Sequence, residues 1–241
     1  MSFNGGFLID NIAALATPTD TNADALFPAA NLIDKIPSVA MRTTGGNANP
    51  RWNLGSAQTI TAFSLHNHNI PNDATIKLQF SSNNWSSVAE ELTLTWASQH
   101  LFLVFAAKTY QYAALSVASS NAYVELGEAG WWTAWQFVRN FNWKARNIKR
   151  VHRDVNWNRG QAFVNVKATQ RGFALSFNDV SAAERLKFDH LLDQEKVCFI
   201  PSFDTNAPYF GTIEDDEIDG EESYGGEALS LRFWADHLGG A

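Results

Sequence analysis

Turn residues divide the first half of the chain into short segments of alternating apolar and polar residues, and this spacing most constrains the fold. Side chains on a β-strand alternate between its two faces, so alternation over about four to eight residues indicates a half-buried strand. Trp52 and Leu54 share one face of such a segment, and Phe63 and Leu65 share a face of the next. We therefore predict strands with Leu54 and Leu65 in the core. The expected strand segments are residues 38–44, 51–55, 59–69, 75–82, 91–97, 100–105, 111–119 and 122–131.

The four residues GSAQ, 55–58, separate two of these segments and are predicted to form a turn between two antiparallel strands. Many short strands separated by turn residues are typical of a β-sandwich or jelly roll. An aromatic content of 13% favours β-structure in the same way. We predict a mainly β chain whose first domain, residues 1–132, is a β-sandwich jelly roll.

The second half changes composition abruptly. Residues 133–160 are basic and aromatic with little periodicity, and are predicted to be an extended connector. Residues 161–241 then alternate again and are predicted to form a β-rich domain with one α-helix. Its expected strands are residues 161–169, 172–180, 196–203, 209–218 and 228–238.

The helix is predicted from a capping box, in which Ser181 stands three residues before Glu184 and each side chain satisfies a free backbone N–H. An apolar face follows at helical spacing. Because Leu186 lies off that face, we expect the helix to be buried on more than one side. The residues of the face are Phe188, Leu191 and Leu192.

Charge and cysteine content exclude several functions. The net charge of -7 argues against nucleic-acid binding by the whole molecule, because phosphate binding needs a basic surface. The single cysteine, Cys198, excludes an internal disulfide and lies in an apolar strand, where a thiol is inert. The longest apolar run has seven residues, against about 20 for a membrane span. With no leader pattern, we expect a soluble chain made in a cytoplasm.

No motif predicts catalysis, a cofactor or a metal centre. His66 and His68 have the spacing of a metal-binding pair, but no Cys or nearby carboxylate completes a ligand set, so a polar strand end is the favoured interpretation. Residues 215–220, DDEIDG, partly match a calcium loop whose twelfth position is Gly226 instead of Glu. A solvated or partner-facing acidic loop is favoured there. Nucleophile elbows, zinc-protease motifs and phosphate loops are missing from the sequence.

Tryptophans interleaved with basic residues suggest a surface for stacking sugars or single-stranded nucleic acid, or else packing between domains or subunits. We favour packing, because Trp and Arg are enriched at such interfaces. The tryptophans are Trp131, Trp132, Trp135, Trp143 and Trp157.

Four stretches resemble, in order, a galactose-binding-like jelly roll of the discoidin type. They are AANLIDK (29–35), RWNLGSAQTITAFSLHNHNI (51–70), ATIKLQFSSNNW (74–85) and YAALSVASSNAYVELGEAGWW (112–132). Discoidin lectins often carry aromatic or basic loop tips. The corresponding loops here are mostly small and polar: TTGGNANP, HNHNIPND and SSNNWSS.

The second half resembles, in layout, the split-barrel domains of tail tube and distal tail proteins of tailed bacteriophages, with strands, one helix and a closing hairpin. The resemblance implies a non-enzymatic structural component of a tail tip or baseplate in the virion, made in the bacterial cytoplasm. Its C-terminal domain would form a homo-oligomeric ring that contacts the tail tube, hub and fibres. A carbohydrate- or receptor-binding module for a host surface glycan is the alternative, and a glycan hydrolase is the third.

Segregated charge independently suggests a ring. Nine of the 18 basic residues lie between Arg139 and Arg171, whereas residues 214–222 hold seven acids and no base. If these segments lie on opposite sides of one domain, each subunit's basic side meets its neighbour's acidic side, and such heterologous contacts close into a ring. The predicted interface residues are Trp143, Arg150, Arg153, Trp157, Asp215 and Asp216.

Overall fold

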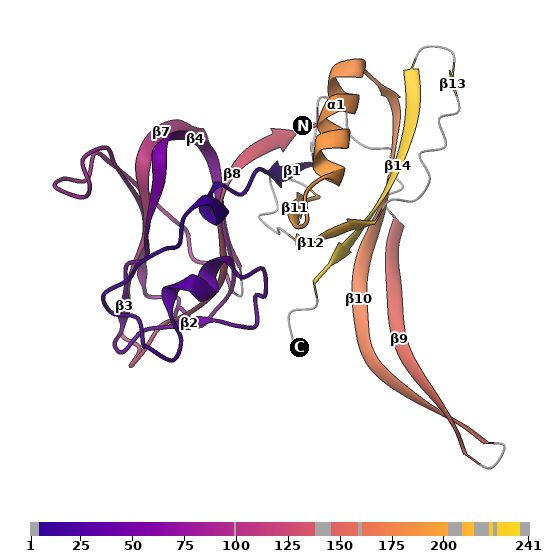
Figure 1. Ribbon diagram of the computed structural model, residues 1–241, viewed down its shortest axis with the longest axis horizontal. Coiled ribbons are helices and arrows are strands. Elements are labelled where there is room, and N and C mark those ends of the chain that lie inside the picture. Colours follow the sequence, from indigo (N-terminus) through magenta and orange to yellow (C-terminus); the bar gives the residue numbers. More distant parts are fainter. Residues whose placement is uncertain are drawn as a thin grey trace. The chain divides into compact units, whose positions relative to one another are not determined.

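The computed structural model describes residues 5–98, 100–137, 146–158, 161–201, 209–214, 222–223 and 226–236. They form two compact units (Figure 1). The jelly-roll unit contains Leu8–Trp135. The C-terminal unit contains residues 5–7 and the described residues from Gln136 onward. The fold is mainly β with one α-helix in the described residues, which confirms the predicted class.

The division between the units differs from the predicted end of the first domain at Trp132. Strand β8 (Glu125–Gln136) continues beyond that residue, and the division falls after Trp135. Strand β1 (Gly6–Ile9) is split, since Phe7 belongs to the C-terminal unit and Leu8 to the jelly-roll unit. Independent folding of residues 1–132 stays a prediction.

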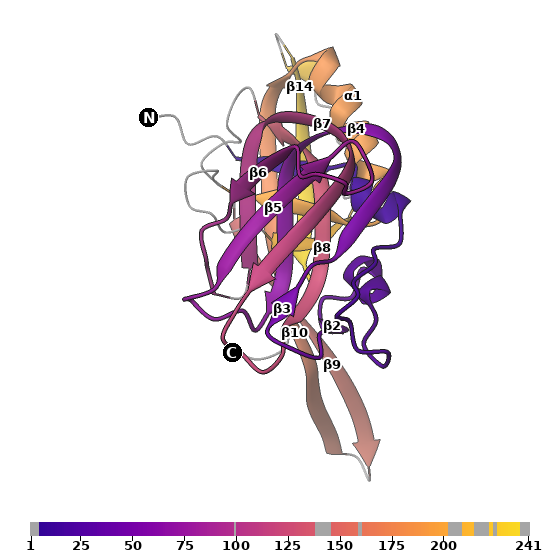
Figure 2. The same cartoon turned by 90° about the vertical axis from the view of Figure 1, so that its left-hand side faces the viewer.

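An antiparallel sheet forms the jelly-roll unit, in the order β6–β5–β7–β4–β8. Its long strands β4 (Arg51–His68) and β7 (His100–Ala118) lie side by side (Figure 2). The other main strands are β5 (Thr75–Ser81) and β6 (Glu90–Thr93). Two short strands pair outside this order, β2 (Met41–Arg42) with β8 and β3 (Asn47–Ala48) with β7. The 3-10 helices η1 (Ile12–Leu15) and η2 (Ala29–Ile33) precede them.

The predicted turn at GSAQ is wrong, because β4 runs through these four residues without reversing. Strand β7 pairs with β4 before these residues, at Asn53, and again from the last of them, Gln58, onward. Between these positions, residues 54–57 of β4 lie opposite the single residue Gln111 of β7, which makes a large bulge or irregularity in the pairing. Gly55 within it has a left-handed backbone, with φ of 78°. A bulge and a hairpin turn have the same sequence pattern, a glycine between two apolar segments. Which of the two forms depends on the pairing with the neighbouring strand, which the sequence does not show.

The predicted core positions are confirmed. Leu65 is fully buried and Leu54 is 5% exposed. The centre of this core is Trp131, whose ring centroid lies 4.7 Å from that of Phe63 and 5.7 Å from that of Phe80. Aromatic rings bury large apolar areas and pack edge to face at such distances, so this cluster stabilises the unit as a whole.

In the C-terminal unit the strand order is β11–β12–β14–β10–β9. Phenylalanine rings fill its core, with Phe199 5.4 Å from Phe233 and 5.1 Å from Phe7 between centroids. The strands are β9 (Arg146–Asn158), β10 (Gln161–Val180), β11 (Val197–Ile200), β12 (Tyr209–Glu214), β13 (Glu222–Ser223) and β14 (Gly226–Ala235).

The predicted connector is partly a strand. Residues 146–158 form β9, which pairs antiparallel with β10 from Gln161 to Ala174. Strand β14 pairs with β10 only from Gly172 onward. Among the described strands, β9 and the first part of β10 therefore form a two-stranded ribbon, seen extending away from α1 in Figure 1. Basic residues interrupt the apolar alternation of β9 in the sequence, but they do not prevent its backbone from pairing with β10.

Helix α1 (Ala182–Leu192) begins at the predicted capping box. Ser181 Oγ accepts from the Glu184 N–H at 3.3 Å, and Glu184 Oε2 accepts from the Ser181 N–H at 3.0 Å. The helix buries Phe188, but Leu186 is 71% exposed, so burial on more than one side is wrong. No helix in the described part of the chain is long and apolar enough to cross a membrane.

Candidate functional site

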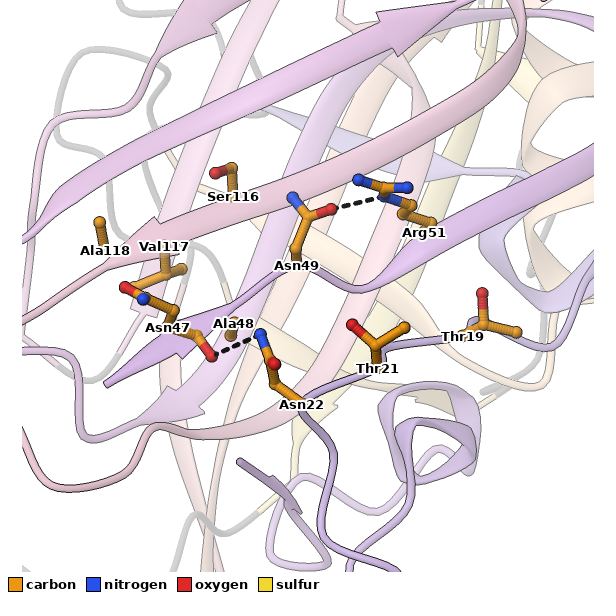
Figure 3. Close-up of a pocket in the computed structure, with 10 residues that line it drawn as sticks. All are labelled: Thr19, Thr21, Asn22, Asn47, Ala48, Asn49, Arg51, Ser116, Val117 and Ala118. Carbon is orange, nitrogen blue, oxygen red and sulfur yellow. Dashed lines mark hydrogen bonds between the residues drawn. The ribbon is translucent and has the colours of Figure 1, made fainter. Parts of the chain in front are cut away.

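A polar pocket of about 440 Å³ lies within the jelly-roll unit (Figure 3). Three chain segments line it: the loop after η1, the segment from β3 into β4, and the end of β7. Hydroxyl and amide side chains predominate, and one residue, an arginine, is charged. The lining residues are Thr19, Thr21, Asn22, Asn47, Ala48, Asn49, Arg51, Ser116, Val117 and Ala118.

Backbone pairing holds these three segments together. Strand β3 pairs with β7 through Asn47 and Ala118, which brings two walls of the pocket side by side. The loop joins β4 through reciprocal bonds of 2.9 Å between the backbones of Thr19 and Arg51. The walls thus belong to the sheet, which favours a preformed pocket.

The carboxylate of Asp20 fixes the loop further. Its Oδ2 accepts from the Asn49 N–H at 2.6 Å, and its Oδ1 accepts from the Asn22 N–H at 2.8 Å. The Asn22 side chain in turn donates to the Asn47 carbonyl at 3.4 Å. Asp20 therefore acts through the backbone as a brace between the loop and the segment that enters β4.

Arg51 stands at the pocket between an amide and an indole. Its Nε donates to Asn49 Oδ1 at 2.6 Å, as Figure 3 shows. Its guanidinium carbon lies 5.1 Å from the ring centroid of Trp85, within the range of a cation–π contact. The Trp85 ring also meets Tyr112 edge to face, with centroids 6.4 Å apart. Arg51 is thus oriented from two sides.

The loop that carries Trp85 is held in an unusual conformation. Asn84 and Trp85 have φ of 53° and 66°, a left-handed region that is costly for a bulky residue. Ser81 Oγ accepts from the Trp85 N–H at 3.3 Å, and Asn83 Oδ1 accepts from the Ser87 N–H at 3.1 Å. Residues held in such strained backbone conformations cluster at functional sites.

None of these pocket residues is among those that the sequence predicts as functional. The pocket nevertheless draws on one of the small, polar loops noted in the sequence, residues 43–50. A second such loop, residues 81–87, carries Trp85, which contacts Arg51. The sequence signal available was Trp85 directly after two asparagines. It becomes informative only when Arg51, 34 residues earlier, is placed beside it.

The two histidines of the predicted metal-binding spacing, His66 and His68, make hydrogen bonds to other residues of the fold. His68 Nδ1 accepts from the Ile70 N–H at 3.2 Å, and its Nε2 lies 3.1 Å from the Ala97 carbonyl oxygen. A neutral ring with its proton on Nε2 satisfies both bonds and leaves no lone pair for a metal. Burial lowers the pKa of His68 to about 4. In the described residues, no group of three or more His, Cys, Asp or Glu is placed to hold a metal ion.

His66, two residues before His68 in the chain, is fully buried. Its Nε2 is 3.1 Å from Ser64 Oγ, which also accepts from Trp132 Nε1 at 2.8 Å. Burial, and then repulsion from His100, hold the pKa of His66 well below its ordinary value. The favoured interpretation of this pair as a polar strand end agrees with these contacts.

The predicted interface residues fall largely where side chains are not described. Arg150, Arg153 and Trp157 lie on β9 and pair through their backbones with Gln170, Val166 and Ala162 of β10. Trp143, Asp215 and Asp216 lie outside the described residues, as does the acidic loop 215–220. The predicted contact between basic and acidic sides stays a prediction.

Cys198 is buried on β11, as the sequence predicts. Burial raises the pKa of its thiol well above the ordinary value, because the thiolate loses its solvation. A thiol of this kind is a core residue and a poor nucleophile.

No protein-family model matches this sequence, and no curated protein does. Among solved structures, the chain is similar to chitosan-binding module 1 of a chitosanase/glucanase from Paenibacillus sp. IK-5, at 22% identity and a TM-score of 0.42. That match covers 51% of this chain and 98% of the module.

Two further similar structures are the lectin domain of lectinolysin in complex with Lewis B antigen and a fucose-binding module from Streptococcus pneumoniae. Their identities are 16% and 13%, and both have a TM-score of 0.45. Each match covers 52% of this chain, and 97% and 98% of the respective neighbours. Because identities and TM-scores are this low, we infer the ligand of this chain from its own pocket.

Proposed function

We propose that the jelly-roll unit is a carbohydrate-binding module and that the pocket at Arg51 is its binding site. The observation that carries this proposal is a hollow lined by amides and hydroxyls with an indole beside its charged residue. Sugar hydroxyls both donate and accept hydrogen bonds, which Asn and Thr side chains match. Trp85 lies outside the ten lining residues and supports the site by packing against the guanidinium of Arg51.

The pocket is also of suitable size, since small-molecule sites occupy about 300–1,000 Å³. We propose binding without turnover. Glycoside hydrolysis ordinarily needs two carboxyl groups at the scissile bond, and the ten lining residues include no Asp, Glu, His or Cys. Incubation of the full chain with a bound glycan tests this, because released reducing ends would show hydrolysis.

A glycan array probed with the full chain tests the proposal. Asn47→Ala removes an exposed amide from the pocket, and we expect binding about two- to tenfold weaker, as for one lost hydrogen bond. Ala118→Trp places a bulky ring at the pocket wall and should abolish binding. Asn72→Ala is the matched control, because Asn72 is exposed and does not line the pocket. If all three variants bind glycans as the wild type does, the glycan binds outside this pocket and the proposed site is wrong.

A second candidate function is assembly into an oligomeric phage tail tip, with other tail proteins as partners. The ribbon of β9 and β10 favours it, because a two-stranded ribbon is marginally stable alone in water and gains from a partner. This role is compatible with glycan binding by the other unit.

Charge reversal tests the assembly role. We expect Arg150→Glu with Arg153→Glu to reduce self-association in light scattering, and Asp215→Lys with Asp216→Lys to do the same. Because the proposed contacts are exposed ion pairs, added salt should weaken them too. Unchanged assembly in both double variants would contradict a charge-complementary ring.

A further inference from the structure

We infer that the glycan is acidic, and that the guanidinium of Arg51 binds its carboxylate. This inference rests on the proposed carbohydrate site and narrows its ligand class. Arg51 is the one charged residue among the ten that line the pocket. Its charge therefore favours a negatively charged group on the part of the ligand that meets Arg51.

No carboxylate pairs with Arg51 among the described residues. Asp20 lies within the lining loop, between Thr19 and Thr21, and its two oxygens accept backbone N–H groups from Asn22 and Asn49. Lys77, which pairs in register with the lining residue Ser116, is neutralised by Glu91. Among the described residues, Arg51 is thus a cation without an ion-pair partner.

The geometry of Arg51 points to a carboxylate. Its Nε is already occupied by Asn49 Oδ1, so the N–H groups on the two terminal nitrogens remain for a ligand. These nitrogens form a planar fork that matches the two oxygens of a carboxylate. An end-on, bidentate contact at this fork leaves the Asn49 bond intact.

Asn49 and Trp85 position this fork. The amide oxygen holds one edge of the guanidinium and the indole lies against it, so less rotamer freedom is lost when a ligand binds. The left-handed backbone at Asn84 and Trp85 keeps the indole in place. Asn49 is therefore a positioning residue, and Arg51 the residue that contacts the ligand.

Matched pairs of glycans test the inference with the full chain. The pairs are sialyllactose with lactose, and oligogalacturonate with its methyl ester, and a sulfated galactose serves as a third arm. We expect the acidic member of a pair to bind about tenfold more tightly, as a charged hydrogen-bond pair does, and to weaken with added salt. Tighter binding of the sulfated sugar alone would overturn the carboxylate assignment.

Variants then assign the effect to the guanidinium. Arg51→Gln should remove the preference for the acidic member, and Arg51→Lys should retain part of the preference because it keeps the charge but loses the fork. Asn49→Ala should reduce the preference without removing it. Lys187→Gln removes the same charge from α1 in the C-terminal unit and is the control.

The outcomes separate the two proposals. If Arg51→Gln weakens the binding of acidic and neutral glycans equally, Arg51 acts only as a hydrogen-bond donor to sugar hydroxyls. The inference of an acidic ligand is then wrong, while the proposed carbohydrate site stands. If no glycan of either kind binds to the folded wild-type chain, the carbohydrate site itself is wrong. Thermal melts of each variant confirm that a lost preference does not come from unfolding.

Discussion

The aromatic core of the jelly-roll unit comes from one continuous stretch of chain, whereas that of the C-terminal unit draws on both ends of the sequence. In the first, Trp131 packs against Trp52, Phe63 and Phe80, all from within Leu8–Trp135. In the second, Phe7 packs against Phe199 and Phe233. A compact unit is therefore not always a continuous segment, and Phe7 contributes to the stability of the C-terminal unit.

Phe7→Ala tests this comparison most strongly. Phe7 is fully buried among aromatic rings, so we expect the C-terminal unit to lose about 3–5 kcal/mol of unfolding free energy. Hydrogen exchange should show lost protection in β11 and β14 and little change in β4 and β7. Leu15→Ala, at a side chain that is 68% exposed, is the control and should cost less than about 0.5 kcal/mol. If hydrogen-exchange protection is lost only in the jelly-roll unit, the assignment of Phe7 to the core of the C-terminal unit is wrong.

Leu54→Ala is the corresponding change in the jelly-roll unit. Leu54 is 5% exposed and packs in the core beside Trp52, so we expect a loss of about 2–5 kcal/mol. Denaturant melts followed by hydrogen exchange should place the effect in the strands paired with β4. A loss below about 1 kcal/mol would mean that the bulge at Gly55 allows the core to close around the smaller side chain.

Acid should destabilise the jelly-roll unit through its histidines. The pKa of His68 is lowered from 6.5 to about 4, so the folded state favours the neutral ring. Its contribution is fully present above about pH 6.5 and is lost as the pH falls toward about 4. We expect a loss of about 2 kcal/mol at about pH 5 relative to neutral pH.

His68→Gln keeps polar atoms at this position but does not titrate. It should therefore flatten the pH dependence of unfolding of the jelly-roll unit, although His66 and His100, whose pKa values are also lowered, keep part of it. Parallel pH profiles for the wild type and His68→Gln would show that His68 contributes nothing. Hydrogen exchange of β4 against pH makes the measurement specific to this unit.

The smallest expected effect is at the start of α1 in the C-terminal unit. Ser181→Ala removes the hydroxyl that accepts from the Glu184 N–H, and we expect a loss of about 1 kcal/mol. Ser181→Asp supplies another acceptor and should retain most of the stability. If Ser181→Ala also lowers the protection of β4, the two units are more strongly coupled than their separate cores suggest.

Alternation in the sequence predicts most strands of the jelly-roll unit and the burial of Leu54 and Leu65, because each depends on residues two apart along one strand. The capping box likewise depends on residues three apart. The strand β9 is poorly predicted, because basic residues interrupt the apolar period on which strand prediction depends.

The sequence by itself therefore determined the mainly β class, the helix start and the residues that face the first core. Only the tertiary structure decided that GSAQ is a bulge, that Phe7 belongs with Phe199, and that Arg51 lies between Asn49 and Trp85. The physical reason is range. Alternation and capping are set by neighbours within a turn or a strand, whereas register, the second core and the pocket depend on segments that meet only when the chain folds.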